Sequence, residues 1–153
     1  MITWQWAAFD ELDAATLCAV LAARQDVFVL EQQCLYADID GKDQRAFHLI
    51  GREQELQQKS QELVAYLRCF APGDHYPEAA LGRVLTVQSA RGRGYGKQLM
   101  AEGMRCVAQY FPGSAIRISA QAHLEHFYGE FGFLRDSDTY LEDGIPHIAM
   151  LKK

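Results

Sequence analysis

The sequence predicts an α/β domain that spans residues 1–153. Three observations support this prediction. The length fits one domain, and 49% hydrophobic residues are enough for one sizeable core. Short segments with alternating or continuous apolar residues, which are typical of strands, recur from the first residues to the last. Two further segments carry apolar residues at helical spacing, and one of them follows a strand through a glycine-rich loop.

The N-terminal part is predicted to form a strand and then a helix. Residues 2–6 alternate between apolar and polar side chains, as in a strand with one buried face. Asp13 can cap the following helix. Arg24 and Glu31 fall on the apolar stripe of that helix, where an unpaired charge is costly to bury. We expect a structural ion pair, a helix end open to solvent, or a ligand pocket lined by Glu31. The stripe consists of Leu17, Val20, Leu21, Val27 and Phe28.

An acidic segment follows at residues 34–43. Asp38, Asp40 and Asp43 resemble the start of a calcium loop in spacing, but the later ligands and the bidentate Glu of an EF-hand are missing. We therefore expect no calcium site. Two interpretations stay open: a polar turn of the Asx type, or an acidic lip that attracts a cationic ligand.

The middle of the chain is predicted to hold a pair of antiparallel strands. Residues 47–51 and 63–70 have the apolar pattern of strands with both faces at least partly covered, and residues 52–62 form a polar turn between them. Residues 71–78 read as a loop. They lead into an apolar run at 81–87, which predicts a buried strand.

A glycine-rich loop joins that strand to a helix that ends near Phe111. Three glycines within residues 92–96 let the backbone turn sharply, and the first N–H groups of the helix point outward without partners. Such a loop binds an anion, usually phosphate. No acidic residue occurs between positions 79 and 101, so the positive charge is local. The cations in this segment are Arg83, Arg91, Arg93 and Lys97.

Two better-known phosphate loops do not fit this spacing. A dinucleotide fingerprint requires a third glycine, and Lys97 or Leu99 stands at that position. A P-loop requires four residues between its glycines and a Ser or Thr after the Lys. Here three residues separate Gly92 from Gly96, and Gln98 follows Lys97.

The C-terminal part is predicted to contain a strand at residues 116–120, a helix at 121–133 that ends at Gly132, and a hairpin. The hairpin strands are residues 139–141 and 145–151, around a turn with the sequence Glu-Asp-Gly. The acidic residues near this turn either form a solvated end of the molecule or make a nearby site more favourable for cations.

Composition excludes several classes of protein. No segment approaches 18 consecutive apolar residues and no signal-like N-terminus is present, so we expect a cytoplasmic protein without a membrane partner. The four cysteines are scattered without zinc-finger spacing, which predicts reduced thiols and no metal. The formal charge of −5, with only residues 79–101 clearly basic, argues against nucleic acid as a partner.

Two motifs in the right order resemble the GNAT superfamily of N-acetyltransferases. The first is R-x-x-G-x-G, formed by Arg91, Gly94 and Gly96. The second is the pair Phe127-Tyr128, four residues before Gly132-Phe133. The resemblance extends over the full chain and is greatest to the ElaA-like branch. Further segments that carry it lie at residues 24–32, 34–41, 121–124 and 143–147.

The resemblance implies a GNAT fold, which is a mixed, mostly antiparallel sheet with helices on both faces and a splayed central strand pair. It also implies acetyl-CoA as co-substrate. The backbone of residues 84–86 would pair with the pantetheine arm, and residues 92–97 would hold the pyrophosphate. Tyr128 would be the general acid that protonates the departing sulfur. The implied cofactor-binding residues are Val84, Leu85, Thr86, Arg91, Gly92, Arg93, Gly94, Tyr95, Gly96, Lys97 and Gln121, the last standing where the family often has Asn.

The general base is open at this point, because neither residues 116–120 nor 81–87 contain a carboxylate. An amine with a pKa near 10 must lose a proton before it attacks, so a base or a water path is needed. Each candidate could equally be a structural residue. The candidates are Glu31, Asp40, His123 and His147.

We expect direct acetyl transfer from acetyl-CoA to a primary amine, since no cysteine lies within either motif to act as nucleophile. The acceptor is open between a small amine, a peptide or protein amine, and an aminoacyl group on tRNA, the last disfavoured by charge. A homodimer also stays open. The alternative function is a non-catalytic acyl-CoA-binding sensor, which the missing strand carboxylate keeps in consideration.

Overall fold

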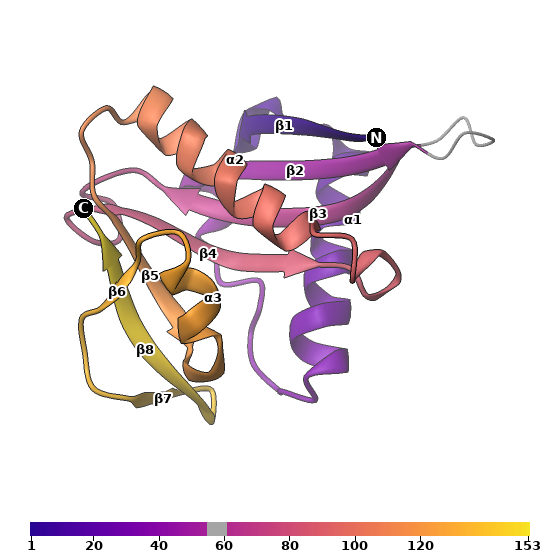
Figure 1. The fold of residues 1–153 in the computed structure, drawn as a ribbon. Helices are drawn as coiled ribbons and strands as arrows, with labels where there is room; N and C mark the ends of the chain where they lie inside the picture. Colours follow the sequence, from indigo (N-terminus) through magenta and orange to yellow (C-terminus); the bar gives the residue numbers. More distant parts are fainter. Residues whose placement is uncertain (55–60) are drawn as a thin grey trace.

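One β-sheet organises the computed structural model, which describes residues 1–54 and 61–153 (Figure 1). Its eight strands within those residues run in the order β1-β2-β3-β4-β5-β8-β6, and β7 pairs with β8. All pairs are antiparallel except β4 with β5, which confirms a mixed, mostly antiparallel sheet. The strands are β1 Ile2–Ala8, β2 Phe47–Gln54, β3 Gln61–Phe70, β4 Ala79–Thr86, β5 Ile116–Gln121, β6 Leu134–Arg135, β7 Tyr140–Glu142 and β8 Ile145–Lys152.

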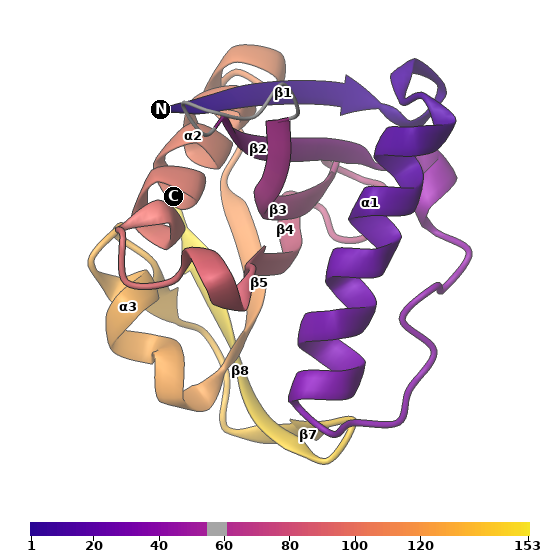
Figure 2. The same cartoon turned by 90° about the vertical axis from the view of Figure 1, so that its right-hand side faces the viewer.

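Helices cover both faces of this sheet, as predicted (Figure 2). On one face lies α1 (Ala14–Arg24), which Asp13 caps by accepting a hydrogen bond from the Thr16 amide at 2.7 Å, and which continues as a π-helical segment, Gln25–Glu31. On the other face lie α2 (Tyr95–Tyr110) and the short α3 (Glu125–Gly129). No helix of the described residues is long and apolar enough to cross a membrane.

The splay of the sheet begins where β4 and β5 lose their pairing. Their parallel ladder covers only Ala79–Leu81 against Ile116–Ile118. Beyond it the two strands diverge (Figure 1). Arg83 adopts a left-handed backbone (φ 50°), and the β3–β4 register shifts beside it, so a bulge bends β4 at this point. The predicted splayed central strand pair is therefore confirmed.

The predicted helix over residues 121–133 is wrong in length. A 3₁₀ turn, Ala122–Leu124, precedes α3, and the backbone of Leu124 (φ −100°, ψ 10°) leaves the helical region between the two. The end is as expected: Gly132 has φ 91°, and the Phe133 amide donates back to the Tyr128 carbonyl at 3.4 Å.

The remaining strand predictions agree with the structure in type and differ in their ends. The C-terminal hairpin turns through Asp143 and Gly144, both with positive φ, as in a type I′ turn. β6 was not predicted, because two residues carry no recognisable alternation. The predicted polar turn at 52–62 is shorter, since β2 and β3 extend to Gln54 and from Gln61, and its central residues 55–60 lie outside the described residues.

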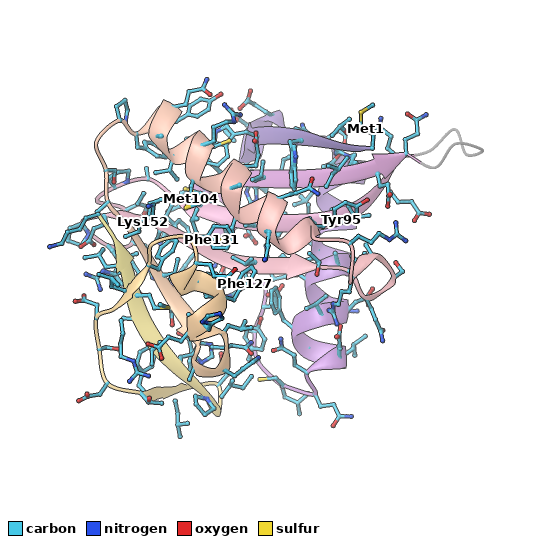
Figure 3. The ribbon with its side chains drawn as sticks, viewed as in Figure 1. Met1, Tyr95, Met104, Phe127, Phe131 and Lys152 are labelled. Atoms are coloured by element: carbon cyan, nitrogen blue, oxygen red, sulfur yellow. The ribbon has the colours of Figure 1, made fainter. Side chains whose placement is uncertain are left out.

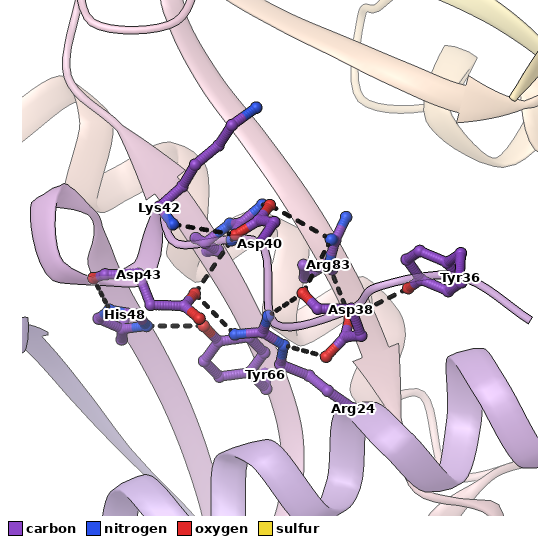
Figure 4. Close-up of polar contacts among 10 residues, drawn as sticks. Arg24, Tyr36, Asp38, Asp40, Lys42, Asp43, His48, Tyr66 and Arg83 are labelled. Atoms are coloured by element: carbon purple, nitrogen blue, oxygen red, sulfur yellow. Dashed lines mark hydrogen bonds and ion pairs between the residues drawn. The ribbon is translucent and has the colours of Figure 1, made fainter. Parts of the chain in front are cut away.

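Arg24 lies at the centre of a buried ion-pair network (Figure 4). Its Nε donates to Asp38 Oδ2 at 2.9 Å, its Nη1 to Asp43 Oδ1 at 2.7 Å, and its Nη2 to the Asp38 carbonyl at 2.8 Å. All three residues are buried, and Arg24 has no exposed surface. The structural ion pair is therefore the correct interpretation of the charge at position 24.

Two more arginines connect this network to the central strands. Arg68 on β3 binds both carboxylate oxygens of Asp40 at 2.9 Å and Asp43 Oδ1 at 3.0 Å. On β4, Arg83 Nε lies 2.8 Å from Asp38 Oδ1. Three guanidinium groups thus balance three carboxylates, and the loop between α1 and β2 is fixed to the sheet.

The acidic segment 34–43 is accordingly a structural turn. The Lys42 amide donates to Asp40 Oδ1 at 3.1 Å, which is the predicted Asx turn. The acidic lip is wrong for Asp38, Asp40 and Asp43, because each of them faces an arginine. Burial by itself would raise the pKa of Asp40 and of Asp43, but the hydrogen bonds from the arginines outweigh it and lower both.

Replacing Arg24 should therefore destabilise the fold strongly. In Arg24→Leu, Asp38 and Asp43 each lose a buried partner, and removal of one side of such a pair costs about 3–5 kcal/mol. Urea unfolding measures the change. Arg135→Leu is the matched control, because its ion pair with Glu125 is exposed and contributes under about 1 kcal/mol. A loss below about 1 kcal/mol in Arg24→Leu would contradict this account of the network.

The same carboxylates should make stability depend on acid pH. The pKa of Asp40 and of Asp43 is lower in the folded than in the unfolded state, where it is about 3.9. Their stabilising contribution is therefore complete above that unfolded value and is lost as pH falls through the folded value. The free energy of unfolding, measured by urea between pH 7 and pH 2, should fall below about pH 4, and less steeply in Asp43→Asn than in the wild type.

Candidate active site

A pocket of about 570 Å³ occupies the gap between the diverging ends of β4 and β5. The π-helical segment after α1, the β7–β8 hairpin and α3 complete its walls. Of the predicted site residues, the pocket brings together Val84, Leu85, Thr86, Arg91, Gln121 and Tyr128. The glycine loop lies beyond its edge, where Arg91 connects the two.

The glycine loop presents a row of unpaired amides. Gly92 and Gly94 have φ of 81° and 78°, and α2 starts immediately afterwards at Tyr95. The first bond of the helix is donated by Gln98 to the Gly94 carbonyl at 3.2 Å. Within the part of the chain that the structure describes, the amides of residues 92–97 have no acceptor. The side of Gly92 and Gly94 where a Cβ would project is open, so an anion can approach these amides closely.

Carboxylates hold the cations of this loop. Arg91 binds both oxygens of Glu31 and also donates to the Thr86 carbonyl at 3.1 and 3.3 Å. Arg93 Nη1 donates to Glu53 Oε2 at 2.7 Å, and the Tyr95 hydroxyl donates to Glu53 Oε1 at 2.6 Å. These bonds lower the pKa of Glu31 and of Glu53.

The geometry divides the loop residues into two groups. The glycines and the amides are open, whereas the side chains of Arg91 and Arg93 are already engaged, and Lys97 lies 3.5 Å from Glu130. The arginines therefore fix the shape of the loop in this structure, and an anion would be held mainly by the main chain.

The β4 wall supplies an open strand edge. Residues 84–86 line the pocket, and past Leu81 this edge of β4 has no strand partner among the described residues. The opposite edge pairs with β3, as shown by Tyr66 against Leu85 and Ala65 against Thr86. Gln121 lies at the far side of the pocket, at the end of β5 and opposite His147 of β8.

Tyr128 reaches the pocket from α3 and is 7% exposed. Its ring packs against Phe127 and Phe133, with centroids 5.1 and 6.2 Å away. Phe127 also approaches α2, since a Cβ on Gly96 would lie 3.7 Å from its ring (Figure 3). The Tyr128 hydroxyl has no hydrogen-bond partner within residues 1–54 and 61–153. Burial raises the pKa of Tyr128 to about 12, so the phenol is a neutral donor at physiological pH.

The four candidate bases occupy different surroundings. Glu31 lines the pocket but is bound by Arg91, and Asp40 lies in the arginine network outside the pocket. His123 lines the pocket from the exposed 3₁₀ turn before α3. His147 lines it from β8 and is buried.

A further polar cluster lies between β5 and the β7–β8 hairpin, and it was not predicted from the sequence. Ser119 on β5 shares a short hydrogen bond with the Tyr140 hydroxyl and donates to Glu142 Oε1 at 3.3 Å. Glu142 Oε2 lies 3.3 Å from His147 Nε2. The alternation of β5 indicates which face Ser119 occupies, but no sequence signal places the hairpin beside it. Among the described residues, no cluster of three or more metal-binding side chains is present.

Comparison with known proteins agrees with this architecture. Residues 22–153 match the family described as the acetyltransferase (GNAT) domain. A UPF0039 protein of Synechocystis sp. is 43% identical over 150 residues, which cover 98% of this chain and 94% of that protein. Protein ElaA of Escherichia coli is 40% identical over 154 residues, covering 100% and 97%.

Solved structures give the same result. The crystal structure of Escherichia coli ElaA matches with a TM-score of 0.89 at 39% identity, and an acyl-CoA N-acyltransferase from Pseudomonas aeruginosa with 0.92 at 35%, each over the full length of both chains. The resemblance to the ElaA-like branch is thereby confirmed, and the chain belongs to the GNAT family of acetyltransferases.

Proposed function

We propose that this protein is an N-acetyltransferase that moves an acetyl group from acetyl-CoA directly to a primary amine. The observation that carries the proposal is the row of open amides at residues 92–97, beside a splayed sheet whose pocket contains the Tyr128 phenol. The acceptor is a small amine, or an amine of a peptide or protein.

The residues present fit the proposed co-substrate. The main-chain amides of residues 92–97 suit a diphosphate, because they are unpaired and lie at the start of a 16-residue helix. The open edge at residues 84–86 offers backbone groups in the extended geometry that an amide-containing arm can pair with. An arm laid along this edge from the loop would bring its thioester end into the pocket that Tyr128 lines.

Tyr128 is suited to act as the general acid. Negative charge moves to the sulfur when the thioester breaks, and a neutral phenol can donate its proton there. Its hydroxyl is free to do so, because no described residue accepts from it. Cys34 also lines the pocket, but its thiol donates its hydrogen to the Asp143 carbonyl at 3.4 Å, whereas a cysteine nucleophile reacts as the thiolate.

The alternative is a sensor that binds acyl-CoA without turnover. One observation favours it: β5 carries no carboxylate, and on β4 the charge nearest the pocket is Arg83. The two functions differ in whether thiol is released from acetyl-CoA.

Coenzyme A should stabilise the wild-type protein against heat. At one hundred times the dissociation constant, a ligand adds about 2.7 kcal/mol, which corresponds to roughly 5–10 °C in Tm for a chain of this size. Gly92→Asp should lose most of this shift, because its carboxylate would repel the diphosphate. Gly113→Asp is the matched control, since both glycines have φ near 80° and open space around a Cβ. Equal shifts in both variants would place the diphosphate elsewhere.

Tyr128→Phe should lower kcat about 10²–10³-fold and leave the Tm shift with coenzyme A unchanged, because only the proton donor is removed. The assay follows free thiol released from acetyl-CoA with spermidine, tyramine, L-lysine and a peptide with a free N-terminus. Wild-type turnover with any of these amines supports the enzyme. A full Tm shift without turnover would instead support the sensor.

A further inference from the structure

We propose that His147 is the general base that takes the proton from the acceptor ammonium, and that Glu142 binds and positions this ammonium. The inference rests on the proposed function and deepens it at the acceptor side of the same pocket. It gives a role to the β7–β8 hairpin wall of the pocket, which lies outside both sequence motifs.

The backbone determines which nitrogen of His147 is available. His147 Nδ1 lies 2.7 Å from the Ile145 carbonyl oxygen. A carbonyl can only accept, so Nδ1 carries the hydrogen, and in the neutral ring Nε2 holds the lone pair. The residue is buried, and its ring stacks on Tyr140 with centroids 6.3 Å apart, which fixes its orientation. Nε2 is therefore the atom that can receive a proton.

Glu142 places a negative charge beside that atom. Its Oε2 lies 3.3 Å from His147 Nε2, and its Oε1 accepts from Ser119 at the same distance. Charge-assisted N–H···O bonds measure about 2.7–2.9 Å, so the contact with His147 is loose. An ammonium group carries three N–H donors, and it can bind Oε2 with one of them while another points at Nε2.

The other candidates lack this combination. Glu31 is bound by Arg91 and Asp40 by Arg68, each through both carboxylate oxygens, and these bonds lower both pKa values. A carboxylate held by a guanidinium is a weak proton acceptor. His123 lies in an exposed turn and has no described partner that would fix its tautomer. Glu142 has no arginine or lysine among its described partners.

The proton transfers balance over the reaction. His147 Nε2 takes one proton from the ammonium, and the neutral amine attacks the acetyl carbonyl carbon. This attack forms the C–N bond. The C–S bond then breaks, and Tyr128 gives its proton to the departing thiolate. The amide nitrogen loses its extra proton to the Tyr128 oxygen. His147 then releases its proton to solvent, so that one proton is produced for each acetyl group transferred.

The charged and titratable groups around the His147 ring come from several elements. They include the hairpin, the loop after the π-helical segment, the loop before β4, and β4 itself. Glu142 and Tyr140 contact the ring itself. The other charged or titratable groups line the pocket with it and are Glu31, Cys34, Tyr36, Arg68, His75, Tyr76, Arg83, Arg91, His123, Tyr128 and Asp143.

The test compares His147→Gln and Glu142→Gln with two controls, His126→Gln and Glu102→Gln, which lie outside the pocket. Thiol release is followed with the fastest amine among spermidine, tyramine, L-lysine and the free peptide, at pH 7 to 9.5. His147→Gln should lower kcat/KM about 100-fold at pH 7. Below the pKa of the amine, this deficit should shrink about tenfold per pH unit, because more amine is then already neutral and needs no base. A purely structural loss would not shrink in this way.

Glu142→Gln should mainly raise KM for the amine, while both controls stay within about twofold of the wild type. Each variant should keep the wild-type Tm shift with coenzyme A, and this shift would show that the variant is folded and binds coenzyme A. A deficit in His147→Gln that is the same at pH 7 and pH 9.5, or the absence of any deficit, would overturn the assignment while the proposed function stands. Absence of turnover in the wild type with every amine would overturn both.

Discussion

The structure depends on the separation of two adjacent parallel strands. β4 and β5 share a ladder only over Ala79–Leu81 and Ile116–Ile118, and the backbone groups beyond it face a pocket. Unpaired backbone groups inside a sheet are costly unless water or a ligand satisfies them. A fold that holds them open must therefore be stabilised elsewhere. Here the loop after α1 supports β4 through the pair of Asp38 with Arg83, and Arg91 supports its end by donating to the Thr86 carbonyl.

The arginine and aspartate network sets the electrostatics of the pocket as well as its shape. Arg68 and Arg83 line the pocket, but their charges are balanced by the carboxylates behind them. This wall thus resists movement without carrying net charge. The hairpin differs from this wall, because Glu142 has no arginine partner among the described residues. The balanced arginines of the central strands and the carboxylate of the hairpin thus line one pocket.

Local patterns were sufficient to predict most of the elements and the glycine loop. Alternation identified the strands, Asp13 identified the start of α1, and Asp143 with Gly144 identified the hairpin turn. What could not be predicted depends on tertiary contacts. The partners of Arg24 lie 14 and 19 residues away, and Glu31 meets Arg91 across 60 residues. The cluster of Ser119 with the hairpin likewise forms only when β8 pairs with β5. The length of α3 was overestimated because its pattern does not reveal the break at Leu124.

The ion pair between Arg91 and Glu31 has a thermodynamic consequence. It joins the glycine loop to the π-helical segment that borders the pocket. If the proposed diphosphate drew Arg91 away from this pair, it would release the Glu31 carboxylate at the pocket wall. The affinities for an anion at the loop and for a ligand in the pocket would then be linked, and linkage is reciprocal: each ligand changes the affinity for the other by the same factor. A single side chain can in this way couple two binding sites without any change in the fold.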